Sequence, residues 1–294
     1  MAKIAMVKAE RVQNGSGKWD MIIGPQRNLF DLRLRELWHA GDLIMLFVRR
    51  DFVSVYKQTI LGPLWYLIQP LLTTIIFTVI FGNFAKLPTD GLPSFLFYMS
   101  GTVIWTYFVS CLTKTSETFV SNANLFGKVY FPRLAVPISI LISNLIAFAI
   151  QFAFFLAFMG YFVLQGTQLH PNWWMLLTPV LLLIMAGLGL GFGIIVSALT
   201  TKYRDLRFLV QFGAQLLMYV TPVIYPISSI PHRFQALIQF NPMSSVVEAF
   251  RYAYLGSGTV NLAQLGYSFS IMLVVIIIGV VMFNRVETTF MDTV

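Results

Sequence analysis

Residues 134–201 read LAVPISILISNLIAFAIQFAFFLAFMGYFVLQGTQLHPNWWMLLTPVLLLIMAGLGLGFGIIVSALTT, 68 residues without a lysine, arginine, aspartate or glutamate. One straight helix of this length would reach about 100 Å, whereas the hydrocarbon core of a bilayer is about 30 Å thick. The chain must therefore turn back once within this stretch. We place the turn at Gln165-Gly-Thr-Gln-Leu-His-Pro-Asn172, which is polar and rich in turn-forming residues.

The composition of the whole chain leads to the same class of fold. Only 11% of its 294 residues are charged and 57% are hydrophobic, whereas a soluble domain has about 25% charged residues. Because charge-free tracts of membrane-spanning length recur along the chain, we predict an all-α, polytopic membrane protein. Its six transmembrane helices are expected at about 61–83, 92–120, 134–164, 173–200, 208–226 and 262–284.

The distribution of lysine and arginine predicts the orientation. With the N-terminus in the cytoplasm, the inside segments hold seventeen of these residues, ten of them before residue 61, and the outside segments hold three. Positive charge favours the cytoplasmic side, so both termini are predicted to be cytoplasmic. The layout is then a flexible tail over 1–28, interfacial or gate helices over 29–60, the six-span domain over 61–284 and a tail over 285–294.

The N-terminal region carries an amphipathic pattern. Phe30, Leu34, Leu37 and Trp38 follow helical spacing, with charged residues elsewhere around the helix. We predict a helix in the cytoplasmic headgroup layer; packing on a soluble partner is the alternative.

Signs of catalysis are absent. The run Gly15-Ser-Gly-Lys18 lacks the glycine and the hydroxyl residue of a P-loop, because Val12 and Trp19 occupy those positions. Cys111, the single cysteine, excludes a thiolate metal cage, and three scattered histidines argue against zinc. We predict no catalytic residue, no metal site and no enzyme activity.

The run Gly187–Gly193 and the position of the acids bear on transport. The run contains two overlapping small-xxx-small patterns, which indicate close helix packing rather than a dinucleotide loop. None of the twelve acidic residues falls in the middle of a predicted span, so an ion-coupled carrier is disfavoured. If the chain transports a substrate, a partner must supply the energy.

Three segments resemble the membrane subunits of polysaccharide ABC exporters. They are Arg49-Arg-Asp-Phe-Val-Ser-Val-Tyr-Lys-Gln-Thr-Ile-Leu-Gly-Pro-Leu-Trp65, Asn122-Ala-Asn-Leu-Phe-Gly-Lys-Val-Tyr-Phe-Pro-Arg-Leu-Ala-Val-Pro137 and Asn241-Pro-Met-Ser-Ser-Val-Val-Glu-Ala-Phe-Arg-Tyr-Ala-Tyr-Leu-Gly256. The resemblance covers roughly residues 28–290. It departs from the family at Gly127, where a further basic residue is common.

The resemblance implies a permease subunit in a bacterial inner membrane that exports O-antigen polysaccharide linked to undecaprenyl pyrophosphate. Two copies would pair with two copies of a cytoplasmic ATP-binding subunit, which would bind ATP and magnesium; this chain would hold no cofactor and bind no nucleic acid. Membrane lipids are the remaining partners. Capsular polysaccharide, teichoic acid and a hydrophobic drug are alternative substrates.

Two cytoplasmic sites are expected. Residues 121–133 resemble the family's coupling helix: Leu125, Val129 and Tyr130 would enter a groove of the ATPase, while Lys128 and Arg133 stay in water. An ordinary basic loop is the alternative. Arg49, Arg50 and Lys57 would bind the lipid pyrophosphate at its entrance, although positive-inside topology alone also explains them.

Aromatic and amide side chains are the candidates for the passage. Tyrosine and tryptophan offer a sugar both an apolar ring and a polar group. The predicted pore-lining residues are Trp65, Tyr66, Tyr98, Trp105, Tyr107, Gln211, Gln215 and Tyr219. Anchoring at the membrane interface and hydrogen bonding between helices are the alternatives. A phenylalanine stripe at positions 148, 152, 155 and 162 is assigned to packing or to contact with lipid rather than to sugar.

The external segment 226–258 is too long for a tight turn and too apolar for a solvated loop. It divides at Asn241-Pro242 into two pieces shorter than a membrane span, which is typical of re-entrant helices. Glu248 and Arg251 lie three residues apart and can pair on one helix face. We predict an external gate here, with simple packing helices as the alternative.

Overall fold

A computed structural model of the protein describes residues 34–57, 60–126, 131–203 and 205–290, and within these ranges all regular elements are helical. Five helical segments are long and apolar enough to cross a membrane. They are Trp65–Phe84, formed by α3 (Trp65–Phe77) and a π-helical end; Ser94–Ser116 (α4); Ala135–Leu164 (α7); Trp173–Thr200, which includes α8 (Thr178–Thr200); and Leu262–Val286 of α12 (Leu262–Phe290). The predicted all-α membrane architecture is confirmed.

The sixth predicted span, at 208–226, differs from the prediction. The helix there, α9 (Leu206–Val220), has 15 residues and is about 22 Å long, shorter than the hydrocarbon core. It ends early because Thr221 precedes Pro222, and a residue before proline is driven out of the helical conformation. Thr221 accordingly has an extended backbone, with φ −95° and ψ 142°.

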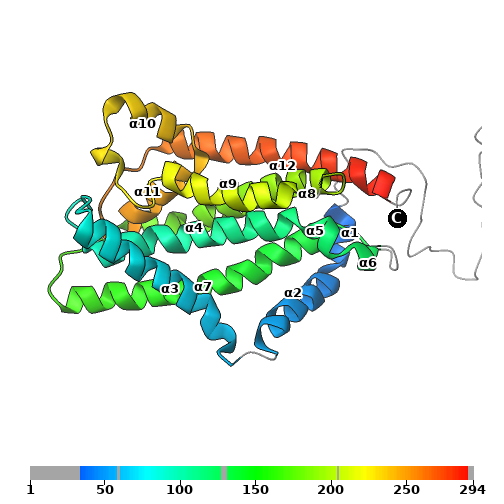
Figure 1. The fold of residues 1–294 in the computed structure, drawn as a ribbon, viewed down its shortest axis with the longest axis horizontal. Helices are drawn as coiled ribbons and strands as arrows, with labels where there is room; N and C mark the ends of the chain where they lie inside the picture. The colour runs from blue at the N-terminus through cyan, green and yellow to red at the C-terminus, as the bar shows by residue number, and fades with distance from the viewer. Residues whose placement is uncertain (1–33, 58–59, 127–130, 204, 291–294) are drawn as a thin grey trace, which may run out of the picture.

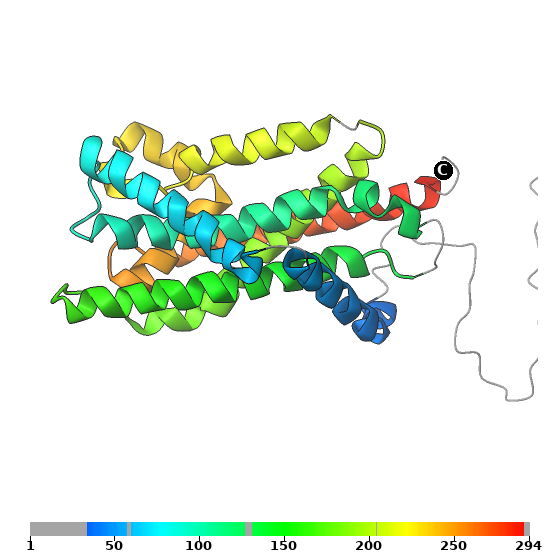
Figure 2. The ribbon, with the colours of Figure 1, turned by 60° about the horizontal axis from the view of Figure 1, so that its bottom comes forward.

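The long helices lie side by side, and the shorter elements gather at their two ends (Figure 1). α10 (His232–Gln239) and α11 (Pro242–Leu255) lie at one end. The short helices α1 (Leu34–His39), α5 (Thr118–Ser121) and α6 (Ala123–Phe126) lie at the opposite end, beside the last described turn of α12. α2 (Gly41–Tyr56) crosses this end obliquely and packs on α7, as the view in Figure 2 also shows.

α8 lies at the centre of the bundle because its glycines let two neighbours approach closely. A Cβ atom on Gly191 would lie 2.9 Å from the backbone nitrogen of Ile276 on α12. A Cβ on Gly189 would lie 2.7 Å from the Cβ of Cys111 on α4. The two small-xxx-small patterns therefore face two different helices, and the packing interpretation of Gly187–Gly193 is confirmed.

The phenylalanine stripe of α7 packs into the core. Phe152 contacts the rings of Phe250 and Tyr254 on α11, with centroid distances of 6.1 and 5.4 Å. Phe155 lies 5.5 Å from Phe250 and is fully buried. The stripe therefore joins α7 to α11 and does not face an open passage, in agreement with its assignment to packing.

Candidate functional site

α9 is the most open of the long apolar helices. Among its 15 residues only Ala214 is buried. The face directed away from the bundle carries the exposed residues Phe208, Gln211, Gln215 and Tyr219, which we call the α9 face. Bulky apolar residues exposed beside it include Leu209, Phe212 and Leu216. In the membrane, lipid or a further protein surface covers such a helix.

The two amides on the α9 face bear on two alternatives, a role in lining the pore and hydrogen bonding between helices. Gln211 and Gln215 are exposed, and no side-chain hydrogen bond joins either of them to another described residue. An amide facing lipid has no partner there, so exposure to hydrocarbon is unfavourable. Pairing within one chain is thus not what holds these amides in place.

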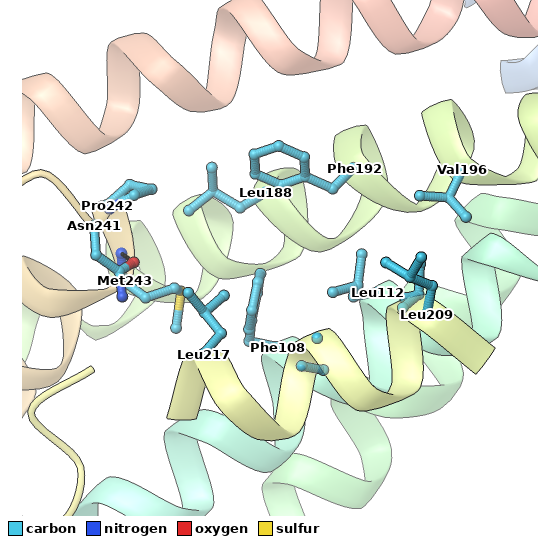
Figure 3. A pocket seen from close by; sticks show the side chains of 13 residues that line it. Phe108, Leu112, Leu188, Phe192, Val196, Leu209, Leu217, Asn241, Pro242 and Met243 are labelled. Carbon is cyan, nitrogen blue, oxygen red and sulfur yellow. Dashed lines mark hydrogen bonds between the residues drawn. The ribbon is translucent and has the colours of Figure 1, made fainter. Parts of the chain in front are cut away.

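The opposite side of α9 borders an apolar groove of about 410 Å³ (Figure 3). Leu209 and Leu217 of α9 form one wall, and Leu188 and Phe192 of α8 form the other. Phe108 of α4 lies at the bottom of the groove. The groove separates α9 from α8 along most of its length, which explains how few of the α9 side chains are buried.

α3 carries two further predicted pore residues. Trp65 begins the helix and is 50% exposed. Tyr66 is partly buried. α3 and α9 both pack against α4, and both lie toward the viewer in Figure 1. Trp65, Gln211, Gln215 and Tyr219 are therefore the predicted pore residues that face outward from this chain.

The three candidates on α4 do not face outward from this chain. Tyr98, Trp105 and Tyr107 are buried in the core. Tyr107 contacts Phe148 of α7 at 5.3 Å, and Trp105 contacts Phe108 at 5.4 Å. α4 packs against neighbours on several sides, so its aromatic side chains fill helix interfaces. Within one chain these three residues therefore contribute to helix packing, and their role at the pore stays a prediction.

The predicted ion pair at the external end is present and is almost completely buried. Nη1 of Arg251 lies 3.3 Å from Oε1 of Glu248, and the two residues are 1% and 6% exposed. The guanidinium also donates to the carbonyl oxygen of Val223 at 3.3 Å and lies 3.7 Å from the centroid of the Phe97 ring. Burial raises the pKa of the Glu248 carboxyl, and the Arg251 guanidinium opposes this effect.

Further polar contacts join the loops at this end of the bundle to one another. Asp90 accepts hydrogen bonds from Ser228 at 2.7 Å and from Ser257 at 3.5 Å. The side chain of Asn172 donates to the carbonyl oxygen of Tyr252 at 3.0 Å. Sequence reasoning missed these residues, because each contact joins segments that are distant along the chain.

Asn241 and Pro242 divide the external segment as predicted. Oδ1 of Asn241 accepts the backbone N–H of Met243 at 3.0 Å and so caps α11, while Pro242 occupies the first helical position. Nδ2 of Asn241 donates to Oγ1 of Thr221 at 2.7 Å, which ties the start of α11 to the end of α9. The external end is thus one connected unit that includes the end of α9.

Comparison with known proteins identifies the family. Residues 42–255 match the ABC-2 type transporter family. The chain belongs to this family. A Klebsiella pneumoniae protein named O-antigen export system permease protein RfbA is 27% identical over 258 residues, 87% of this chain and 96% of the relative. A Myxococcus xanthus protein of the same name is 27% identical over 74% of this chain and 82% of the relative. The Escherichia coli polysialic acid transport protein KpsM is 23% identical, over 83% and 93%.

Membership in the ABC-2 family assigns the protein to a class of function. ABC-2 permeases are the membrane components of transporters, and they pair with a cytoplasmic ATP-binding subunit. The recognition of an ABC exporter subunit from its three segments is therefore confirmed.

The predicted coupling segment, residues 121–133, is described in part. Lys128, Val129 and Tyr130 lie outside the described residues. Leu125 is partly buried against the cluster that includes Phe126 and Phe131. Arg133 was expected in water, but it is buried, with its guanidinium 5.5 Å from the Phe126 ring. Its long side chain lies over this aromatic cluster, which the sequence pattern did not reveal.

The three basic residues of the predicted lipid entrance are all exposed and belong to the C-terminal half of α2 and its cap. Arg50 forms an ion pair with Asp51 at 2.8 Å, and its guanidinium lies 4.9 Å from the Phe47 ring. Arg49 and Lys57 present their side chains on the same exposed end of α2. The neighbouring Lys114 of α4 donates to Oδ1 of Asn144 at 2.8 Å.

Proposed function

We propose that this ABC-2 permease exports O-antigen polysaccharide linked to undecaprenyl pyrophosphate, across a bacterial inner membrane, in a complex with two ATP-binding subunits. The choice of substrate rests on the similarity to two relatives named for O-antigen export, one of them matched over 96% of its length. Because 11% of the residues are charged and no acid falls mid-span, the energy is assigned to the ATP-binding subunit.

A homodimer is proposed from the α9 face and α3. Trp65, Phe208 and Tyr219 are all about half exposed or more, although a single chain in lipid gains nothing by presenting unpaired amides beside them. A second copy would cover the apolar residues and leave Gln211 and Gln215 along a polar passage. Amides and aromatic rings together suit a sugar, which has apolar ring faces and many hydroxyl groups.

The route through the complex follows the two ends of the bundle. Arg49, Arg50 and Lys57 are proposed to bind the pyrophosphate at the cytoplasmic entrance, since guanidinium and ammonium groups bind phosphate well. Residues 121–133, with Leu125, Lys128, Val129, Tyr130 and Arg133, are proposed to transmit movement from the ATPase. The segment 226–258 is proposed as a re-entrant external gate, and α9 with the turn residues after it as the sixth span.

Capsular polysaccharide is the second candidate substrate. It is favoured by the likeness to KpsM, whose name refers to polysialic acid transport. The identity to KpsM is lower than that to the O-antigen export permeases, so O-antigen remains our first choice.

Reconstitution distinguishes the two substrates. The permease and its cognate ATP-binding subunit are purified together, placed in liposomes and assayed for ATP hydrolysis. We expect stimulation by undecaprenyl-pyrophosphate-linked O-antigen and little effect of lipid-linked capsular polysaccharide. Stimulation by the capsular lipid or by hydrophobic drugs alone would contradict the O-antigen assignment.

The amides of α9 provide a test within the chain. We expect the double substitution Gln211→Leu and Gln215→Leu to lower O-antigen export by about ten-fold or more, because two hydrogen-bonding groups for hydroxyls are lost at about 0.5–1.5 kcal/mol each. Insertion and thermal stability should be unchanged. Gln165→Leu, at the exposed outer end of α7, is the matched control. Unchanged export in the double variant would remove these residues from the passage.

A further inference from the structure

Pro70 interrupts the hydrogen bonding of α3. Proline has no backbone N–H, so the carbonyl oxygen four residues earlier, that of Tyr66, loses its usual helical partner. Both residues lie in a helix with membrane-spanning length, where a backbone group without a partner is costly. A neighbouring side chain must therefore satisfy the Tyr66 carbonyl.

Gln151 of α7 supplies that hydrogen bond. Its Nε2 donates to the carbonyl oxygen of Tyr66 at 2.9 Å, although the two residues are 85 positions apart in the sequence. Gln151 is only 4% exposed, and its Oε1 has no hydrogen-bond partner within the described part of the chain. The orientation of the amide is determined by the carbonyl, since only the N–H side can donate to it.

A second polar contact holds α3 on the other side of the proline. Oγ1 of Thr74 lies 2.9 Å from Oγ1 of Thr102 on α4, and it also donates to the carbonyl oxygen of Pro70 at 2.8 Å. Thr74 and Thr102 are both buried. α3 is therefore joined to α7 one turn before Pro70 and to α4 one turn after it. The contact with Gln151 is the one of these bonds that lies on the same side of Pro70 as the first turn, which carries Trp65.

We infer that Gln151 is a positioning residue for transport: it replaces the hydrogen bond that α3 loses at Pro70 and so sets the direction of the turn that carries Trp65. The inference rests on the proposed role of α3 at the passage. Its chemistry does not depend on the identity of the glycan. Any substrate that passes Trp65 would be affected by the same contact.

A double-mutant cycle tests the specific link between Gln151 and Pro70. Gln151→Leu removes the donor, and we expect export to fall about three- to ten-fold, in line with the size of hydrogen bonds between membrane helices. Pro70→Ala restores a backbone N–H that can bond to the Tyr66 carbonyl. In that background, Gln151→Leu should change export less than two-fold. If the two substitutions act independently, the inference is overturned.

A labelling measurement separates this inference from the proposed function. Cys111 is replaced by alanine, Trp65→Cys is introduced, and the rate of maleimide labelling is measured in the purified complex. We expect Gln151→Leu to change this rate at least two-fold and Pro70→Ala with Gln151→Leu to restore it, whatever the substrate is. An unchanged rate in Gln151→Leu would overturn the inference even if export fell.

Two further variants sharpen the result. Gln151→Met keeps the approximate length of the side chain but has no hydrogen-bond donor, so it should resemble Gln151→Leu in labelling and export. Gln165→Leu, a change of the same residue type on the same helix, should have no effect on either measurement. A strong effect of Gln165→Leu, or a wild-type rate in Gln151→Met, would contradict a role for donation at position 151.

Discussion

Arg251 and Glu248 form an ion pair that water barely reaches. Each charge replaces part of the solvation that the other has lost. The carbonyl oxygen of Val223 and the ring of Phe97 make two more contacts with the guanidinium. A buried pair of this kind contributes little net stability compared with apolar residues, but removing one partner leaves a charge without solvent. The pair therefore serves to hold α11 against the loop after α9 and the start of α4.

The double substitution of this pair should be more stable than the single substitution of Arg251. We expect Arg251→Met to lower the free energy of unfolding by about 3–5 kcal/mol, because the buried carboxyl of Glu248 then loses its opposite charge. Adding Glu248→Leu should recover a large part of that loss. Thermal unfolding of the purified complex measures both. A double variant that is less stable than Arg251→Met would show that the carboxylate is stabilised by other groups.

For single residues, the sequence predicted which neighbours along the chain form pairs, but it did not predict which side chains are buried. The spacing of Glu248 and Arg251 predicts their pairing, and the proline after Asn241 predicts the start of α11. Nothing local tells Tyr98, which is buried, from Tyr219, which is half exposed, because the difference arises from which helices surround α4 and α9. For the same reason the sequence did not reveal the contact of Gln151, whose partner is 85 residues away.

Among the helices, α8 is the one whose close packing depends most on glycine. Gly187 and Gly191 face α12, while Gly189 and Gly193 face α4, so both interfaces bring backbones together. The spacing of the glycines predicted the packing, but only the structure shows that the two patterns face different helices.

Gly191→Ala and Gly213→Ala form a matched pair of helix substitutions. A Cβ at position 191 would lie 2.9 Å from a backbone nitrogen of α12, whereas one at position 213 would meet nothing within 4 Å. We expect Gly191→Ala to destabilise the protein by about 1–3 kcal/mol through overpacking. Gly213→Ala should be neutral or stabilising by up to about 1 kcal/mol. Equal thermal unfolding of the two variants would argue against close packing of α8 and α12.

For the whole molecule, the number of membrane crossings decides how the two ends are assigned. Five segments have spanning length, and an odd number would place the termini on opposite sides of the membrane. The division of lysine and arginine into seventeen cytoplasmic and three external residues is obtained only if α9 also crosses the membrane. α9 is about 22 Å long, so its crossing requires a contribution from the turn residues that follow it or a locally thinner membrane.

Cysteine labelling on either side of α9 determines whether it crosses. Cys111, the single native cysteine, is fully buried and should stay silent. Lys202→Cys and Arg233→Cys place exposed thiols before and after α9. In spheroplasts treated with a membrane-impermeant maleimide, we expect Arg233→Cys to react at once and Lys202→Cys to react only after lysis. If both react before lysis, or both only after it, α9 does not cross, and the gate and coupling segments can no longer both lie on their proposed sides.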